Sequence, residues 1–477
     1  MNMILKTAWK NVWRNRVRSL VVIASVTVGI FAGVFSVAFM NGMIAQRFDA
    51  AIDEEISHIQ ITGKDYILNN DPSIYMNSGD GIVQTVSAIP GVEQVVVRKM
   101  ITGMAGTASK SAGVQIIGID PDAEKRIFKL YTTIIQGTGD YFERESKYEL
   151  ALIGQDLAKE LNIIRFSVDS TVLSRLGEQK VPDEIIEKLE SISGRRFPNE
   201  KKFTSTVTSI LTKSELKEYG QLIKKEAWSY RGNSRMTLTF LDKDNNQVSS
   251  VFRIAGIFDI KNAMFEQSQV FIKNDDLSRL TGMDENSFHQ VVIRISDINQ
   301  SEIITDNIRT RFPGLDVKNW KELQPDLAMM TDYVHQIYGF FMGIILAALA
   351  FGIINTMLMV VLERTRELGM LTAIGMNKRK VFSMIMLESV FLSITGGIAG
   401  MIAGWITIIL TAKNGINFAQ YAEGMEAFGY SAHIFPEISS GFFVMVTVLI
   451  IITGIASSVY PALKALKLDP AEAIRTE

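Results

Sequence analysis

The chain of 477 residues contains no cysteine and only four histidines, which are widely separated at His58, His289, His335 and His433. The absence of cysteine excludes disulfide bonds, thiolate metal sites, a cysteine nucleophile and a lipidated N-terminal cysteine. Histidines this scattered also argue against a histidine-rich metal site, because such a site gathers several imidazole ligands. We therefore expect no metal to be bound by this chain.

An excess of charge of one sign is also lacking, since 49 Lys and Arg residues stand against 51 Asp and Glu residues. This near-neutral balance gives no reason to expect a nucleic-acid partner. A phosphate-binding loop requires Gly-x4-Gly-Lys followed by Ser or Thr. The nearest candidate, Lys110-Ser111, has Ser109 and Met104 in place of the two glycines. Neither Gly-x-Ser-x-Gly nor His-Glu-x-x-His occurs, so we predict no catalytic site and no cofactor bound by this chain.

Long hydrophobic runs are present instead, although apolar residues make up only 47% of the whole chain. Each of four runs reaches the roughly 20 residues that a helix needs to cross a bilayer. The first run could be a cleavable signal peptide, but it exceeds the ~7–15 apolar residues usual for one. A buried core helix is the alternative for each run, and four such runs in one chain disfavour it. The predicted transmembrane helices are 19–42, 336–362, 381–411 and 441–463.

Basic residues indicate how these spans are oriented. Lys and Arg are concentrated in 1–18, in 363–380 and in 464–477, whereas the charges of 412–440 after Lys413 are acidic. Cytoplasmic loops of membrane proteins carry the excess of Lys and Arg. We therefore place both termini and 363–380 in the cytoplasm, and 412–440 outside it together with the large segment between the first two spans.

That large segment, 43–335, mixes strand-like and helix-like stretches separated by Gly, Asn and Asp turns, which is typical of an α+β domain. A strand, a helix, a Pro-Gly turn and a second strand occur near its start, around Pro90-Gly91, and again near its end, around Pro313-Gly314. The predicted fold class is therefore a four-helix membrane protein with a large α+β extracytoplasmic domain between the first and second spans.

We expect the two similar ends of this domain to pair. They would form a membrane-proximal subdomain of about 43–111 plus 271–335, leaving a distal subdomain of about 112–270. The highly charged stretch of about 167–232 is interpreted as an insertion within the latter. It is either a surface elaboration or a docking surface for a partner.

Several local motifs carry a likeness to a known family. The most specific is Glu-Arg-Thr-Arg-Glu-Leu-Gly-Met-Leu at 363–371, followed by Ala-Ile-Gly at 373–375. With the order of one span, a large exported domain and three closing spans, it resembles the FtsX-like permease family of ABC transporters, which includes LolC, LolE and the membrane part of MacB. Further similar stretches lie at 8–19, 152–158, 255–258, 269–272, 460–462 and 468–475.

The resemblance implies that 363–380 is a coupling helix that seats on a cytoplasmic ATPase. Its apolar residues Leu368, Met370, Leu371 and Ile374 would then face a groove on that partner, with charged residues at the rim. The alternative is a plain loop whose basic residues only set the topology. The predicted ATPase-coupling residues are Glu363, Arg364, Arg366, Glu367, Leu368, Gly369, Met370, Leu371 and Gly375.

Two features of the third predicted span need an explanation. Gly396, Gly397, Gly400 and Gly404 form a small-residue face that permits close helix approach. This face serves either contact between two permeases or packing within one chain. Glu388 is the one acidic residue inside a span, and it either faces a partner group or reaches toward the nearby cytoplasmic end.

For function, the resemblance implies a permease that passes ATP-driven motion to the exported domain. ATP and Mg would be bound by a separate ATPase subunit, in two copies, and a second permease, identical or paralogous, would complete the complex in the inner membrane. We expect release of lipoproteins toward the outer membrane. MacB-like efflux with a periplasmic adaptor, and FtsX-like signalling to a cell-wall hydrolase, are the alternatives, while a membrane-anchored enzyme would need an active site.

Overall fold

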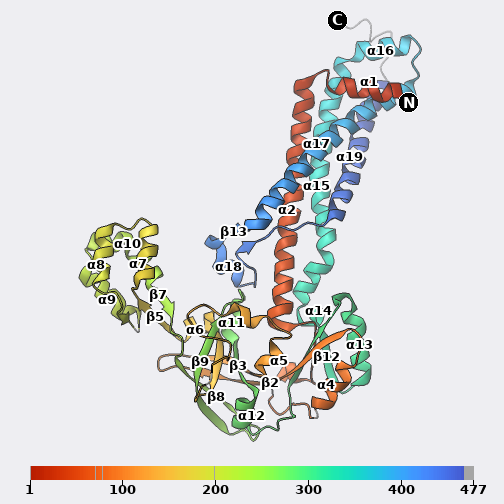
Figure 1. Cartoon of the computed structure of the whole chain (residues 1–477). Helices are drawn as coiled ribbons and strands as arrows, with labels where there is room; N and C mark the ends of the chain where they lie inside the picture. The colour runs from red at the N-terminus through yellow and green to blue at the C-terminus, as the bar shows by residue number, and fades with distance from the viewer. Residues whose placement is uncertain (1, 70, 78, 145, 198, 467–477) are drawn as a thin grey trace. The chain divides into compact units, whose positions relative to one another are not determined.

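The computed structural model describes residues 2–69, 71–77, 79–144, 146–197 and 199–466 (Figure 1). The similar stretch noted at 468–475 therefore lies outside the described residues. The chain forms two compact units. The helical unit comprises residues 1–47, 329–422 and 431–477, and the sheet unit comprises 48–328 and 423–430.

The described residues contain four helices that are long and apolar enough to cross a membrane. Each predicted span lies inside one of them, and each helix is longer than its span because helical hydrogen bonding continues past the apolar run. The fourth helix also continues through Pro461 to Leu466. The long helices are α2 (Arg16–Ala50), α15 (Pro325–Glu363), α17 (Lys378–Asn414) and α19 (Ser440–Leu466), and α1 (Asn2–Val12) precedes them.

The predicted coupling helix at 363–380 is not one continuous helix. It contains α16 (Thr365–Ala373), followed by a turn and the first residues of α17. Gly375 adopts a φ of +98°, which glycine tolerates and which ends the helix. Asn377 then caps α17 by accepting a hydrogen bond from the backbone N–H of Arg379.

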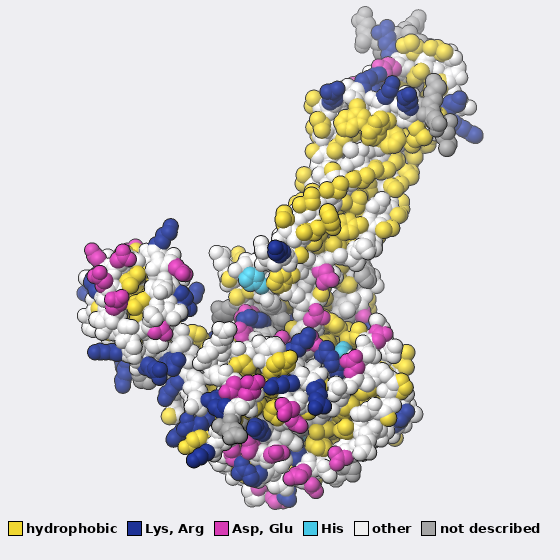
Figure 2. Space-filling view, viewed as in Figure 1, with side chains coloured by type: hydrophobic (Ala, Val, Ile, Leu, Met, Phe, Trp, Pro, Cys, Tyr) yellow, Lys and Arg dark blue, Asp and Glu magenta, His cyan; other side chains and the backbone are white. Residues whose placement is uncertain are grey.

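A single apolar core holds the helical unit together. Val26, Ile30 and Val34 follow one another at four-residue spacing along α2 and are buried against the other long helices, including Val446 and Ile450 of α19. Many large apolar side chains on the outside of the bundle remain uncovered, such as Phe351, which is 74% exposed. Figure 2 shows these side chains along the bundle, with Lys and Arg gathered at the end that carries α1 and α16 (Thr365–Ala373). Such a surface suits a hydrocarbon environment.

The sheet unit is built on nine strands in the order β12-β1-β11-β2-β3-β10-β4-β9-β8. β8 also pairs with β2, so the six strands from β2 to β8 form a closed, barrel-like ring. The strands are β1 (Ile59–Gly63), β2 (Val92–Gly106), β3 (Ser111–Ile119), β4 (Leu150–Gly154), β8 (Arg235–Leu241), β9 (Gln247–Phe258), β10 (Gln269–Lys273), β11 (Gln290–Ile295) and β12 (Leu315–Asn319).

The two similar ends of the domain share this sheet. β1 pairs antiparallel with both β11 and β12, and β11 pairs with the first half of β2. The helices α4 (Gly79–Ser87) and α13 (Ser301–Arg311) bury Val86 and Ile308 in the same apolar cluster as the strand residues Ile61 and Val291. Each end of the domain therefore contributes two strands to one sheet and one helix that packs in the same apolar cluster.

The charged stretch expected to be an insertion has a hydrophobic core of its own, which includes Phe166, Leu176 and Phe203. Its strands form a separate three-stranded sheet in the order β6-β5-β7. A capping box between Thr212 and Glu215 begins its longest helix. Its elements are β5 (Ile164–Ser167), α7 (Ser170–Glu178), α8 (Asp183–Glu190), β6 (Arg196–Phe197), α9 (Glu200–Ile210), α10 (Lys213–Ala227) and β7 (Trp228–Tyr230).

Short elements complete the two units. They are the helices α3 (Tyr66–Asn69), α5 (Pro121–Glu124), α6 (Gln155–Glu160), α11 (Ala263–Ser268), α12 (Asn274–Thr281), α14 (Trp320–Leu323) and α18 (Ala422–Glu426), and the strands β13 (Ile416–Asn417) and β14 (His433–Ile434).

Candidate functional site

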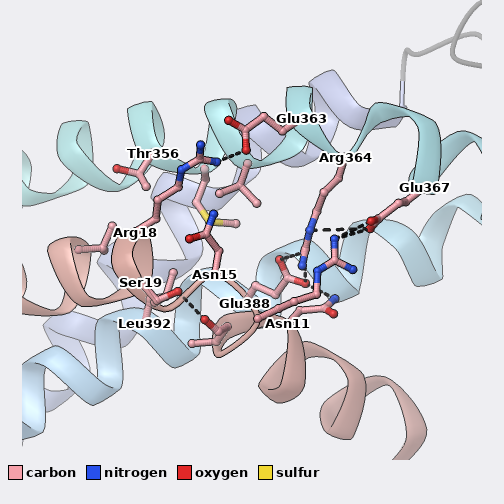
Figure 3. A pocket seen from close by; sticks show the side chains of 15 residues that line it. Asn11, Asn15, Arg18, Ser19, Thr356, Glu363, Arg364, Glu367, Glu388 and Leu392 are labelled. Atoms are coloured by element: carbon pink, nitrogen blue, oxygen red, sulfur yellow. Dashed lines mark hydrogen bonds and ion pairs between the residues drawn. The ribbon is translucent and has the colours of Figure 1, made fainter. Parts of the chain in front are cut away.

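A polar cavity of about 300 Å³ lies in the helical unit where α1, the start of α2, the end of α15, α16 and α17 meet. Figure 3 shows charged side chains from these helices pointing toward one another across it. Its lining includes three arginines and three glutamates, which are Arg14, Arg18, Arg364, Glu363, Glu367 and Glu388. We call these six residues the charge cluster.

Two ion pairs of the charge cluster connect the turn before α2 and the start of α2 to the coupling segment. Arg14 Nη2 donates hydrogen bonds to both carboxylate oxygens of Glu367, at 2.6 and 2.8 Å. Arg18 forms an ion pair with Glu363. All four side chains are partly open to solvent, and each such pair is worth about 0.2–1 kcal/mol. The two ion pairs therefore add little stability. Their contribution is to hold the end of α15 and the start of α16 close to α2 and to the turn before it.

Glu388 is the buried centre of the cluster, with only 5% of the residue exposed. Its Oε1 accepts a hydrogen bond from Asn11 Nδ2 at 2.6 Å and lies 3.4 Å from Arg364 Nη1. A buried carboxylate is tolerated when it is paired and hydrogen-bonded. Of the two sequence-based alternatives for Glu388, the structure therefore shows the one in which it faces partner groups, and these come from α1 and the α15–α16 junction.

The apolar residues of α16 do not all face outward as expected. Leu368 is buried in the core of the helical unit and Leu371 is partly buried against it. Met370 and Ile374 are 51% and 80% exposed. The expectation that all four face a partner is thus wrong for Leu368 and Leu371, because positions three and four apart share one helix face and the others point away.

Three of the exposed residues of this segment, Arg366, Met370 and Ile374, form a stripe at four-residue spacing. We call this the outer stripe of α16. Gly369 is buried beside Leu368 on the opposite face, and Gly375 ends the segment in a left-handed conformation. The outer stripe presents one guanidinium and two apolar side chains.

Sequence reasoning assigned no contact to Asn11, Arg14 or Arg18. It used the two arginines for the topology and the stretch 8–19 for the family likeness. One signal for their pairing was available. Arg14 and Arg18 are four residues apart, and so are Glu363 and Glu367, so two matched sets of opposite charge occur at helical spacing. α1 itself is held by packing, since Ala8 and Val12 are buried in the core of the helical unit.

The four glycines of α17 lie against helices of the same chain. A Cβ atom added at Gly396 would lie 2.7 Å from Val26 Cβ, and one at Gly400 would lie 2.6 Å from the backbone oxygen of Thr27. The glycine face therefore lets α17 approach α2 closely. A Cβ atom added at Gly404 would lie against the side chain of Val34 of α2, and one added at Gly397 would lie against the side chain of Ile450 of α19.

Comparison with known proteins places the chain among membrane transporters. Residues 339–470 match the family described as FtsX-like permease C-terminal, and residues 19–194 match the MacB-like periplasmic core domain. The chain is 30% identical over 177 residues to the uncharacterized ABC transporter permease YknZ of Bacillus subtilis, covering 37% of this chain and 40% of the relative.

Two further relatives carry more specific names. The macrolide export ATP-binding/permease protein MacB of Chlorobium luteolum is 33% identical over 179 residues, covering 37% of this chain and 24% of MacB. The lipoprotein-releasing system transmembrane protein LolC of Xylella fastidiosa is 20% identical over 235 residues, covering 47% of this chain and 55% of LolC. The chain thus spans less than two thirds of the length of each of these relatives.

These matches agree with the architecture, in which one apolar helix precedes a large α/β domain and three apolar helices follow it. The predicted fold class is confirmed, and the four apolar helices make the chain a multi-pass membrane protein. The chain belongs to the FtsX-like, MacB-type family of ABC transporter permeases.

Proposed function

We propose that the chain is a permease subunit that receives motion from a separate cytoplasmic ATPase through α16 and passes it to the sheet unit. The observation that carries this proposal is the charge cluster. Arg14 and Arg18 hold Glu367 and Glu363, while Glu388 joins Asn11 to Arg364. A displacement of α16 therefore moves α1, α2, α15 and α17 together.

The order of the helices along the chain also supports transmission of motion from α16 to the sheet unit. α2 leads the chain into the sheet unit, and α15 leads it back out. Both helices are tied to α16 at one end by the charge cluster. Two conformations of the complex, one favoured by bound ATP, are sufficient for such coupling. ATP and Mg belong, in this proposal, to two copies of the ATPase, and a second permease completes the assembly in the inner membrane with all chain termini cytoplasmic.

The outer stripe of α16 is the proposed ATPase contact. Met370 and Ile374 are exposed apolar side chains at a short helix, and the basic residues that flank it predict a cytoplasmic location. An amphipathic helix with such anchors fits a groove on a partner protein. Arg366 forms no ion pair among the described residues, so its guanidinium is available to a carboxylate at the rim of that groove.

Affinity purification of the tagged chain from its native membrane tests this contact. We expect an ABC ATPase to co-purify with the wild type and with Met370→Leu, which keeps an apolar side chain. Met370→Glu and Ile374→Glu place a charge in the proposed groove, so both should lose the ATPase. Full retention of the ATPase by correctly folded Glu variants would remove the outer stripe from the contact.

For the cargo, we propose a lipoprotein released from the inner membrane toward the outer membrane. The similarity to LolC, which extends over 235 residues, supports this choice. Export of a small molecule or peptide with a periplasmic adaptor is the second candidate, and the 33% identity to MacB supports it. Signalling to a cell-wall hydrolase, as in FtsX, is the third.

Cross-linking mass spectrometry on the complex from native membrane separates these candidates. Acylated lipoproteins linked to the chain would support lipoprotein release. Links to an adaptor or to an outer-membrane channel would favour export instead, and links to a cell-wall hydrolase would favour signalling.

A further inference from the structure

A second cavity, of about 690 Å³, lies between the C-terminal half of α17 and the beginning of α19, and it shares no lining residue with the cavity of the charge cluster. Ile402, Trp405 and Ile409 line it on α17, and Phe443 and Val444 line it on α19. Apart from a few polar groups near the start of α19, these walls are hydrocarbon. We call this cavity the α17–α19 groove.

We expect the α17–α19 groove to face the bilayer. Both of its helices are long and apolar enough to cross a membrane, and Trp405 and Val444 are 53% and 66% exposed. The α17 side extends from Ile398 to Ile409, about 16 Å at 1.5 Å per residue. That length is close to half of the ~30 Å hydrocarbon core, so the groove matches one acyl chain of a single leaflet.

One end of the groove carries a carboxylate. Glu437 lines the cavity beside Ser440 at the point where the chain enters α19. The backbone of Glu437 is held in place, since its N–H donates to the carbonyl of Ala38 at 3.0 Å and its carbonyl accepts from Asn41 Nδ2 at 3.3 Å. Its side chain is exposed and has no hydrogen bond or ion pair among the described residues.

An exposed carboxylate at the mouth of a membrane-facing groove attracts cationic groups at the membrane surface. A lipid ammonium group supplies both the positive charge and N–H donors for a charge-assisted hydrogen bond. An anionic headgroup would be repelled at this position. The charge of Glu437 and the apolar walls together favour a zwitterionic lipid, and the N–H donors of a primary amine distinguish it from a quaternary ammonium lipid.

We infer that the α17–α19 groove binds one phospholipid with a primary-amine headgroup, of the phosphatidylethanolamine type. One acyl chain lies along Trp405 and Phe443, and the ammonium group contacts the Glu437 carboxylate. This site is separate from the proposed ATPase contact and does not depend on which cargo is moved. It would fasten the start of α19 to the surface of the bilayer.

Trp405 provides a reporter inside the groove. The full chain is reconstituted in vesicles in which a fraction of the lipid has brominated acyl chains, which quench tryptophan fluorescence on contact. The chain has 5 tryptophans, so the contribution of Trp405 is taken as the difference between the wild type and Trp405→Phe. Brominated phosphatidylethanolamine is compared with brominated phosphatidylcholine, which has the same net charge and lacks the N–H donors.

We expect the apparent affinity at Trp405 to be about twofold to fivefold higher for the amine lipid, because only its N–H groups donate to the carboxylate, and such an exposed contact is worth about 0.4–1 kcal/mol. Glu437→Gln should remove this preference, and Glu437→Asp should retain most of it. Equal quenching by both lipids would overturn the inference, as would a preference that survives in Glu437→Gln. Absence of quenching by either lipid would show that protein, such as a second permease, covers the groove.

Discussion

Arg14 and Glu367 are 353 residues apart in the sequence, yet one guanidinium nitrogen of Arg14 donates to both carboxylate oxygens of Glu367. The pair connects the turn between α1 and α2 to the coupling segment. Together with Arg18 and Glu363 it forms two parallel links between parts of the chain that lie on either side of the sheet unit in the sequence.

Charge reversal at this pair tests whether the links transmit motion. Arg14→Glu and Glu367→Arg each place like charges together, so we expect each single variant to lose most cargo-dependent stimulation of ATP hydrolysis in reconstituted membranes. The double variant restores an opposite pair and should recover a substantial part of the stimulation. Thermal stability should change by only about 1 kcal/mol because the pair is exposed.

The same exchange at Arg18 and Glu363 is a parallel test of the second ion pair, and we expect the same result there. If both single variants of Arg14 and Glu367 retain full coupling, the ion pair has no part in transmission. If the double variant is no better than the singles, the two residues act independently.

Removal of the Glu388 carboxylate should destabilise the helical unit. Glu388→Leu leaves Arg364 and Asn11 without their shared acceptor, and breaking a buried pair in this way costs about 3–5 kcal/mol. Glu388→Gln keeps an oxygen for Asn11 Nδ2 and should lose less. The measurement is the unfolding midpoint in detergent, and equal midpoints for wild type and Glu388→Leu would contradict the central role of this residue.

Close packing of α17 on α2 predicts a strong effect at Gly400. A methyl group there would meet the backbone oxygen of Thr27 at 2.6 Å, so Gly400→Ala should cost about 1–3 kcal/mol through overpacking. Gly352→Ala is the matched control, because no atom lies within 4 Å of a Cβ added at that helical glycine. Comparable unfolding midpoints for the two variants would show that α17 moves away from α2 without cost.

The sheet unit should show a pH dependence that originates at Glu266. This residue is 1% exposed, and burial, with further repulsion from Asp259 and Asp156, raises its pKa to about 8, although a hydrogen bond from the Ile260 N–H opposes the shift. The folded state therefore holds a proton that the unfolded state releases above its ordinary pKa of 4.5. Stability should consequently fall as pH rises from about 4.5 to about 8.

Glu266→Gln isolates this contribution from those of other titrating groups. Its stability relative to the wild type should increase steadily between pH 5 and 8 and then level off. Denaturant unfolding of the full chain at a series of pH values provides the measurement. A constant difference between the two proteins across this range would mean that the carboxyl group does not hold a proton in the folded state.

The insertion should be removable without loss of the rest of the fold. Phe166 of β5 pairs directly with Trp228 of β7, so a short Gly-Ser turn can replace residues 168–227. The deleted segment has its own apolar core, and we expect the shortened chain to keep its four spans and its ATPase. Loss of ATPase co-purification from a folded deletion variant would contradict the interpretation of this segment as an insertion.

Local patterns in the sequence were sufficient for much of this description. Four apolar runs predict four membrane-crossing helices because the thickness of the bilayer sets their length. The distribution of Lys and Arg predicts their orientation, and the motif at 363–375 indicates the family. These properties are readable along the chain because each depends on neighbouring residues.

Only the tertiary structure decided which residues meet. The inward face of Leu368, the partners of Glu388 and the contact of Gly400 with α2 all depend on how helices distant in the sequence pack. The sequence by itself determined the spans, their predicted orientation and the family likeness, because hydrophobic length and local motifs are properties of adjacent residues. The charge cluster was decided by folding, since Arg14 and Arg18 lie 353 and 345 residues from their partners and only packing of the helices brings them together.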